Sequence, residues 1–141
     1  MEIKNKKAYF DYFIEDEYEA GIVLHGTEIK SIRKGSANLN DCYIRIKNDE
    51  AYIINMYIAK YEQGNIHNHD ETRERKLLLN KREILKLKTG VMQEGYNIVP
   101  LKLYIKNGRA KLLIGLAKGK KQHDKREVIK KRDLEREKRN Y

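Results

Sequence analysis

The sequence predicts a mainly β protein, a small antiparallel barrel with flanking helices, followed by a basic tail. Short alternating or apolar stretches, separated by turn residues, make about six strands, and only two stretches have helical spacing. The strands are joined mostly by turns, which favours an antiparallel barrel over a parallel sheet with crossover helices. From residue 118 onward aliphatic residues become rare. We therefore expect one domain over residues 1–117 and a separate tail over residues 118–141.

The N-terminal third predicts strand before helix. Residues 1–7 are a short polar arm, and residues 9–24 place aromatic and apolar residues on both alternating sets, which predicts one or two strands. A helix is predicted from Gly26 to Lys34. Ile29 and Ile32 give this helix its core spacing, and Gly35 ends it.

Two hairpins are predicted further along the chain. Residues 42–47 and 51–54 flank an Asn-Asp turn, and residues 96–106 and 110–118 flank Asn107-Gly108, a strong hairpin signal. Pro100 within the second hairpin predicts an edge strand or a bulge. Residues 60–75 are polar and predict a long exposed loop.

A second helix is predicted over residues 81–92. Asn80 is its expected N-cap, and Glu83 stands three residues later, as in a capping box. Ile84, Leu85 and Leu87 are expected to supply the buried face, and Gly95 lies beyond the end.

The charge is uneven. The chain of 141 residues has a formal net charge of +10, of which residues 118–141 contribute eleven Lys/Arg against five Asp/Glu, a net of +6. Such an excess predicts attraction to a polyanion through Lys and Arg that neutralise phosphates. The tail has three aliphatic residues, Val128, Ile129 and Leu134. We expect it to be disordered when free and to fold into a helix against an anionic partner.

Composition also predicts the cellular compartment. Cys42 is the single cysteine, so no internal disulfide is possible and a reducing compartment fits best. No apolar run approaches the roughly 20 residues of a membrane helix, and the N-terminus lacks an apolar signal core. The expectation is a cytoplasmic protein that does not contact the membrane.

Catalytic and metal-binding patterns are weak. His67, His69 and Asp70 are potential ligands, but adjacent loop residues rarely enclose a metal without distant partners, and an ordinary polar loop is the better interpretation. No phosphate-binding loop, dinucleotide glycine set or nucleophile elbow is present. We expect no enzyme, no metal and no cofactor. The acidic residues from Glu15 to Glu19 predict ion pairs, or carboxylates that accept hydrogen bonds from base amino groups.

Two further stretches carry candidate RNA-binding residues. Residues 72–80 place three cations before an apolar stretch and a helix start, which fits a solvated loop that enters a core helix. An exposed Leu beside the cap residue would be able to pack on unstacked bases. Residues 118–126 bracket Gly119 with lysines, so backbone and cations can both approach phosphates.

The sequence resembles the SmpB family, whose members are SsrA-binding proteins, along essentially its whole length. The resemblance rests on three blocks in order: Asn5 through Arg33, Arg75 through Asn80, and Ala117 through Arg126. It implies a six-stranded barrel of the oligonucleotide-binding (OB) type, with no catalysis. Phe10 stands where the family often carries His, so stacking is kept and a hydrogen bond is lost.

The resemblance also implies a function and a set of residues. A family member partners transfer-messenger RNA in trans-translation, the rescue of stalled bacterial ribosomes, as a monomer that meets small-subunit ribosomal RNA and reaches elongation factor Tu indirectly through the charged RNA. The residues implied to face the tRNA-like domain of transfer-messenger RNA are Asn5, Lys6, Glu19, Leu78, Asn80, Gly119, Lys120 and Lys121. The tail is implied to enter the empty messenger channel, with His123, Asp124, Lys125 and Arg126 near the decoding centre.

Two other functions stay open on sequence grounds. One is a structural RNA-binding protein, such as a ribosomal protein with a basic extension, which composition alone permits. The other is a small nuclease that uses the histidine and acidic residues of the loop around His67.

Overall fold

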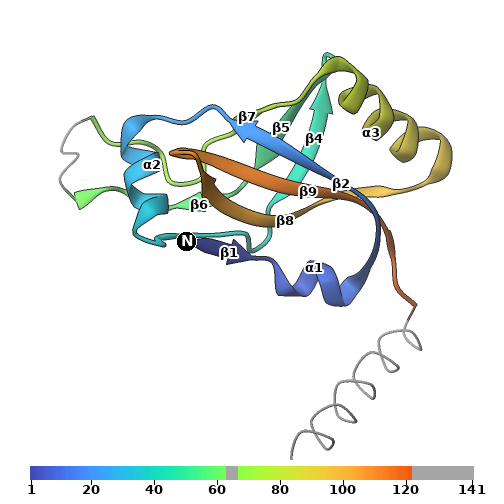
Figure 1. Ribbon diagram of the computed structural model, residues 1–141, viewed down its shortest axis with the longest axis horizontal. Helices are drawn as coiled ribbons and strands as arrows, with labels where there is room; N and C mark the ends of the chain where they lie inside the picture. The colour runs from blue at the N-terminus through green and yellow to red at the C-terminus, as the bar shows by residue number, and fades with distance from the viewer. Residues whose placement is uncertain (63–66, 122–141) are drawn as a thin grey trace, which may run out of the picture.

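The computed structural model describes residues 1–62 and 67–121 (Figure 1). The chain forms three helices and nine strands in these residues. In order they are β1 (Glu2–Lys4), α1 (Lys6–Asp11), β2 (Tyr12–Ile22), α2 (Gly26–Arg33), β3 (Ala37–Asn38), β4 (Tyr43–Lys47), β5 (Glu50–Ile54), β6 (Tyr57–Ile58), β7 (Arg75–Leu78), α3 (Lys81–Glu94), β8 (Asn97–Lys106) and β9 (Arg109–Gly119).

Seven strands form one antiparallel sheet in the order β1-β8-β9-β2-β7-β5-β4, and β3 pairs with β6 in a small second sheet. The predicted antiparallel, mainly β fold with flanking helices is therefore confirmed. The sheet is OB-like but not closed, because no hydrogen-bonded ladder joins β4 to β1 or β8 among the described residues. It has seven strands where about six were expected, and two of the seven, β1 and β7, were not predicted.

Both predicted hairpins are present. Asn107 and Gly108 adopt φ values of 52° and 76°, and Asn48 and Asp49 adopt 52° and 59°. Two consecutive residues with positive φ are what the tightest hairpin turns require. The ladder of β8 with β9 shifts register between Pro100 and Lys102. Pro100 thus lies at a bulge, as its missing N–H predicts.

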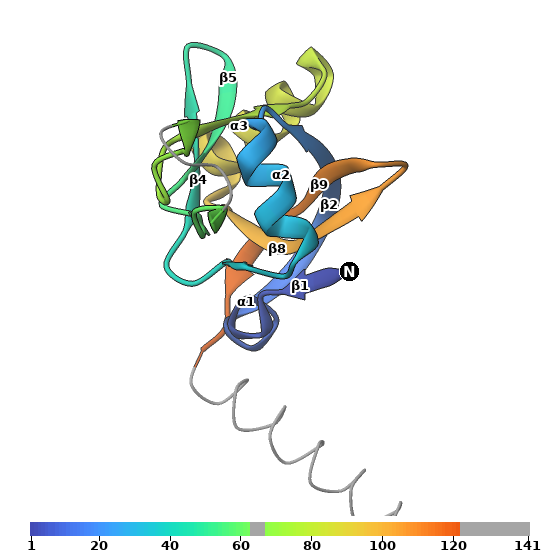
Figure 2. The same cartoon turned by 90° about the vertical axis from the view of Figure 1, so that its left-hand side faces the viewer.

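The sheet carries a core on each face. On one face, Ile32 of α2 and Leu87 of α3 pack on strand residues such as Ala20, Leu112 and Ile114. On the other face, α1 covers a smaller cluster through Ala8, which packs with Val99, Leu101 and Ala117. Figure 2 shows α1 below the sheet, away from α2 and α3. The face that α1 covers is here called the outer face.

The N-terminal prediction was wrong in detail. Residues 1–7 are not an arm, and Tyr9, Phe10 and Asp11 belong to α1 rather than to a strand. The Asn5 side chain caps this short helix by accepting a hydrogen bond from the Ala8 N–H at 3.2 Å. Burial of Ala8 then holds the helix on the sheet. Strand β7 was also missed, because it is short and its first inward residue is charged.

Helix α3 follows its prediction closely. Asn80 Oδ1 accepts from the Glu83 N–H at 2.8 Å, and Glu83 Oε1 accepts from the Asn80 N–H at 3.0 Å, which completes the capping box. Ile84 and Leu87 are buried as expected, whereas Leu85 is 63% exposed. Gly95 ends the helix at φ 71°.

Two further expectations can be placed. In the described parts of the chain, none of the helices combines the length and the apolar character that a membrane crossing needs. Strand β9 continues through Lys118 and Gly119, so the body's last strand includes the first residues assigned to the tail. The expected disorder and helicity of the tail concern residues 122–141, which lie outside the described residues.

Candidate nucleic-acid interface

Glu19 lies near the middle of the outer face. Side chains alternate along β2, so the buried Ala20 points into the main core and the exposed Glu19 points outward. The neighbouring strands are β9 and β7, and Glu19 is opposite Leu113 of β9. The acidic residue of the predicted set is therefore available to a ligand that lies across the sheet.

Two residues of β8 hold the Glu19 carboxylate. The Tyr104 hydroxyl donates a short hydrogen bond to Oε2, and Lys106 Nζ lies 3.4 Å from the same oxygen. The Tyr104 hydrogen bond, followed by the Lys106 charge, holds the pKa of Glu19 below the usual glutamate value. The pKa of Tyr104 is raised by partial burial and by the same contact. Glu19 is thus a fixed, ionised acceptor, which can receive hydrogen bonds from base amino groups.

Leu78 and Asn80 lie at the junction of β7 and α3. Leu78 is 54% exposed and pairs with Gly21, two residues from Glu19 on the same side of β2. A Cβ atom added at Gly21 would lie 3.2 Å from the Leu78 Cβ, so the glycine lets this side chain lie close against β2. Asn80 is exposed and uses Oδ1 for the α3 cap. Leu78 thus presents an apolar contact beside the Glu19 carboxylate.

The remaining described candidates gather where β9 ends. Gly119 pairs with Tyr12 at the start of β2, and the Lys120 N–H donates to the Asp11 carbonyl at 2.8 Å. This pairing brings the lysines after β9 to α1, which begins with the exposed Lys6 behind its cap residue Asn5. The Asn5 amide donates to the Pro100 carbonyl at 2.8 Å, so the capping residue also ties α1 to β8.

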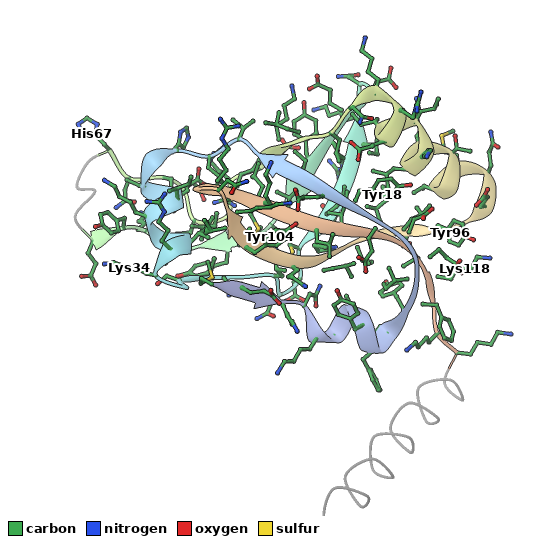
Figure 3. All side chains as sticks on the ribbon, in the orientation of Figure 1. Tyr18, Lys34, His67, Tyr96, Tyr104 and Lys118 are labelled. Carbon is green, nitrogen blue, oxygen red and sulfur yellow. The ribbon has the colours of Figure 1, made fainter. Side chains whose placement is uncertain are left out.

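Aromatic rings accompany these lysines. Lys120 Nζ lies 5.0 Å from the centre of the Phe13 ring, and Lys118 Nζ lies 4.7 Å from that of Tyr96. Figure 3 shows Tyr96 and Lys118 together near the end of β9. Such pairs hold the long lysine side chains beside flat surfaces, an arrangement that suits phosphate and base contacts. Phe10 lies half-buried on α1, and Lys121 is exposed.

The predicted residues therefore form two groups rather than one. Glu19 and Leu78 share the outer face, whereas Asn5, Lys6, Gly119 and Lys120 lie where α1 meets the end of β9. The candidates His123, Asp124, Lys125 and Arg126 lie outside the described residues. Sequence reasoning missed Tyr104 and Lys106, although the Asn107-Gly108 turn fixes the hairpin register and alternation then places both with Lys102 on the outer face.

Two of the cations near residue 75 have a structural task. Arg75 and Glu28 are both fully buried and form a short ion pair. Arg75 also donates to the carbonyls of Met56 and Glu71, and Arg73 Nε lies 3.1 Å from Glu28 Oε1. The expected solvated loop is thus wrong for Arg75, whose charge is needed to neutralise Glu28 inside the protein.

The loop histidine is structural as well. His69 is buried, with Nδ1 2.9 Å from the Thr27 hydroxyl and Nε2 2.9 Å from the Ile58 carbonyl oxygen. No group of three or more potential metal ligands occurs within residues 1–62 and 67–121. Burial raises the pKa of the Cys42 thiol to about 12, and its Sγ lies 3.2 Å from the Leu39 carbonyl oxygen. This thiol stays protonated near neutral pH.

Comparison with known proteins gives a consistent result. A family model described as SmpB protein matches residues 2–141. An SsrA-binding protein of Shouchella clausii (strain KSM-K16) is 62% identical over 134 residues, which are 95% of this chain and 86% of that protein. An SsrA-binding protein of Anoxybacillus flavithermus is 59% identical over 134 residues, 95% of this chain and 87% of the relative.

A solved structure is similar over the same length. It is described as "tmRNA-SmpB: a journey to the center of the bacterial ribosome", and its chain superposes with a TM-score of 0.71 at 44% identity. The superposition covers 91% of this chain and 94% of the other. The family match, the two relatives and the shared fold agree along nearly the whole sequence, and the chain belongs to the SmpB family.

Proposed function

We propose that this protein is an RNA-binding adaptor of trans-translation. It binds the tRNA-like domain of transfer-messenger RNA and delivers that RNA to stalled ribosomes. The observation that carries the proposal is the likeness, in both sequence and fold, to a solved chain whose description names tmRNA and the bacterial ribosome. An adaptor of this kind would work in the cytoplasm, as a monomer without a cofactor.

The two residue groups would divide the recognition of the RNA. Lys6, Lys120 and Lys121 would neutralise phosphates and set the orientation of the protein, since phosphate contacts carry affinity without sequence information. Glu19 would supply selectivity, because a carboxylate near RNA loses affinity unless base amino groups donate to it. Leu78 would pack on an unstacked base, and the exposed Asn80 would hydrogen-bond beside it.

The tail would sense the state of the ribosome. Residues 122–141 and a messenger cannot occupy the same channel, so only a ribosome with an empty channel would admit the tail. His123, Asp124, Lys125 and Arg126 would then lie near the decoding centre and meet small-subunit ribosomal RNA. Elongation factor Tu would take part through the charged RNA. In this scheme the protein positions RNA and makes no covalent change, which fits the structural tasks of His69 and Cys42.

Pull-down of the tagged protein from a bacterial lysate, with sequencing of the bound RNA, tests the proposal. We expect transfer-messenger RNA to be enriched far above its share of total RNA. Ribosomal RNA in proportion to ribosome content, without this enrichment, would favour a ribosomal protein instead. Incubation of labelled RNA with protein and divalent metal tests the nuclease alternative, for which we expect intact RNA.

A further inference from the structure

The outer face has a second glutamate, Glu50, on the far side of Leu78 from Glu19. Strand β7, which ends with Leu78, pairs with β2 on one side and with β5 on the other. Leu77 of β7 pairs with Ala51 of β5, and both residues are buried. Because successive side chains of a strand point to opposite faces, the residues next to this pair, Leu78 and Glu50, point to the outer face. Leu78 therefore lies between two carboxylates.

The Glu50 carboxylate is held by a tyrosine and a lysine, as the Glu19 carboxylate is. Lys76 Nζ lies 2.7 Å from Glu50 Oε2, and the Tyr52 hydroxyl donates to the same oxygen at 3.4 Å. The hydrogen bond from Lys76 keeps the pKa of Glu50 below the usual glutamate value. The side chains of Glu50 and Lys76 remain 43% and 41% exposed. Glu50 is thus an oriented, ionised acceptor that a ligand can reach.

The Tyr52 ring lies between two cations on neighbouring strands. Tyr52 pairs with Arg45 of β4 on one side and with Lys76 of β7 on the other. Residues directly opposite each other in antiparallel strands have Cβ atoms about 5 Å apart, so both cations flank the ring closely. Arg45 is exposed, and its guanidinium lies 6.0 Å from the centre of the Tyr43 ring. Aromatic rings beside cations are typical of surfaces that bind single-stranded nucleic acid.

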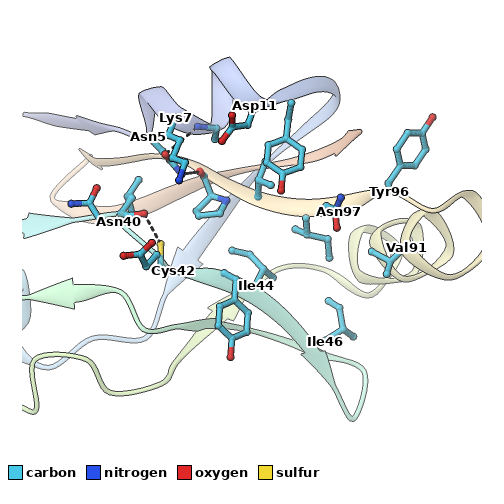
Figure 4. A pocket seen from close by; sticks show the side chains of 18 of the residues that line it. Asn5, Lys7, Asp11, Asn40, Cys42, Ile44, Ile46, Val91, Tyr96 and Asn97 are labelled. Atoms are coloured by element: carbon cyan, nitrogen blue, oxygen red, sulfur yellow. Dashed lines mark hydrogen bonds between the residues drawn. The ribbon is translucent and has the colours of Figure 1, made fainter. Parts of the chain in front are cut away.

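The two sides of β4 differ in character. Ile44 and Ile46 line a groove of about 890 Å³ between α1, the start of β8, β4 and α3 (Figure 4). The exposed Arg45 and Lys47 alternate with these two residues and point to the opposite side of the strand. Lys47 pairs with Glu50, so both cations of β4 lie on the face that carries the carboxylate. Together with Lys76 they outnumber Glu50, and this part of the outer face attracts phosphate.

We propose that Glu50, Tyr52 and Arg45 form a second nucleotide site, which takes an unpaired nucleotide of the RNA that contacts Leu78. The base stacks on Tyr52 and donates its amino group to Glu50, and Arg45 binds a phosphate. Lys76 is a positioning residue, because it holds Glu50. It lies two residues from Leu78, about 6.6 Å along the strand, a spacing that adjacent nucleotides can follow. The site rests on the proposed function only for the identity of the RNA.

A fluorescent ring at position 52 tests the stacking. The chain has no tryptophan, so Tyr52→Trp introduces a single one. Binding of the tRNA-like domain, followed by gel shift, should quench its fluorescence strongly, because a base lies against the ring. Tyr57→Trp is the control, since it places the ring in the small sheet of β3 and β6, and its fluorescence should change little. Bound RNA that leaves the Tyr52→Trp fluorescence unquenched would overturn the inference.

Two substitutions separate recognition of the base from charge. Glu50→Ala and Asp49→Asn each remove one negative charge from the β4–β5 hairpin and one exposed ion pair with a lysine. Asparagine also tolerates the φ of 59° at position 49. Through charge alone, both variants would bind any RNA slightly more tightly. We expect Glu50→Ala instead to bind the tRNA-like domain roughly tenfold more weakly, since a hydrogen bond to a charged group is lost. Equal effects of the two substitutions would contradict the role of Glu50.

Failure of the proposed function gives a different result. Equal affinity of the unaltered protein for the tRNA-like domain and an unrelated RNA would remove the adaptor role. Oligoadenylate, whose bases each have an amino group, then probes the site by itself. Quenching of Tyr52→Trp by oligoadenylate, together with weaker binding of this RNA to Glu50→Ala, would retain the nucleotide site. Binding of oligoadenylate without either effect would overturn it.

Discussion

At the scale of single residues, the proposed selectivity for RNA would depend on the Glu19 carboxylate and on the side chain that orients it. Glu19 lies on the outer face because successive side chains of β2 point to alternate faces of the sheet. Tyr104 and Lys106 of β8 maintain its ionised state. A carboxylate without such contacts would rotate more freely. In the proposed function, the Tyr104 hydroxyl would therefore be a positioning group for RNA recognition.

Tyr104→Phe should weaken binding of the tRNA-like domain severalfold, because the Glu19 carboxylate loses the donor that orients it. Titration of labelled RNA measures the effect, and Glu19→Ala, which removes the acceptor, should abolish most of the sensitivity to the Tyr104 change. Tyr57→Phe is the matched control, since Tyr57 also hydrogen-bonds a glutamate, Glu71, but lies in the small sheet. Equal losses from both tyrosine changes would show that only stability is being measured.

Sequence reasoning reached Glu19 but not its partners. Glu19 and Tyr104 are 85 residues apart, and their contact crosses β9. The same reason explains the error at Arg75, whose partner Glu28 is 47 residues away. A charged residue in a polar stretch is predicted to be exposed to solvent unless the residue that neutralises its charge is known. The sequence alone does not supply that pairing.

At the scale of elements, those that depend on local sequence signals were predicted, and those that depend on long-range packing were missed. The α3 cap, the α2 start and both hairpins depend on residues within a few positions of each other, and all were predicted. Helix α1 has six residues, too few for a periodic pattern, and is stabilised by burial of Ala8 on β8 and β9. Strand β7 likewise depends on its neighbours, β2 and β5.

Two roles of Asn80, the cap of α3 and the proposed contact with RNA, can be distinguished with two substitutions. Asn80→Ala should lower the free energy of unfolding by about 1 kcal/mol, since the N-cap acceptor is lost. Asn80→Ser should keep most of that stability, because serine also caps helices well. If the Asn80 amide meets RNA, both variants should bind the tRNA-like domain more weakly. Serine binding with wild-type affinity would restrict Asn80 to the cap.

The buried ion pair of Glu28 with Arg75 fastens the start of β7 onto α2 and should make the free energy of unfolding depend on pH. Burial alone would raise the pKa of Glu28, but hydrogen bonds from Arg73, the His25 N–H and Arg75 outweigh it and lower the pKa below 4.5. A lowered folded-state pKa means that stability is present above the usual glutamate pKa and is lost as pH falls through the folded value.

Glu28→Gln should therefore cost about 3–5 kcal/mol at neutral pH, the range for leaving a buried charge unpaired. Its disadvantage should shrink as pH falls below 4.5, because the wild-type carboxylate then takes up a proton in the unfolded chain, and it should be smallest below the lowered folded-state pKa. Urea unfolding at several pH values measures both effects. Glu50→Gln breaks the exposed pair with Lys76 and should change stability little. A Glu28→Gln difference that did not vary with pH would refute this account of the pair.

At the scale of the whole molecule, the structure joins a body with a nearly balanced charge to a cationic extension. Residues 1–117 hold twenty Lys/Arg and sixteen Asp/Glu, whereas residues 118–141 hold eleven and five. The basic excess therefore follows the strand that ends beside α1. This distribution was evident from the sequence, but the meeting of Lys120 with Asp11 and the groove beside it required the fold.

Body and tail should have separable tasks. Deletion of residues 122–141 should largely spare binding of transfer-messenger RNA and abolish tagging of the peptide on stalled ribosomes. Binding is measured with purified RNA, and tagging in a reconstituted translation system with a message that lacks a stop codon. Tagging that survives the deletion would remove the role assigned to the tail.

The central claim is that the body recognises one RNA fold and does not simply attract phosphate. The most direct measurement is the affinity of the full-length protein for the isolated tRNA-like domain against an unrelated structured RNA of equal length and charge, over a series of salt concentrations. Added salt weakens the phosphate contribution to both complexes. The account predicts that the tRNA-like domain keeps a clear advantage at moderate salt. Equal affinities there would contradict it.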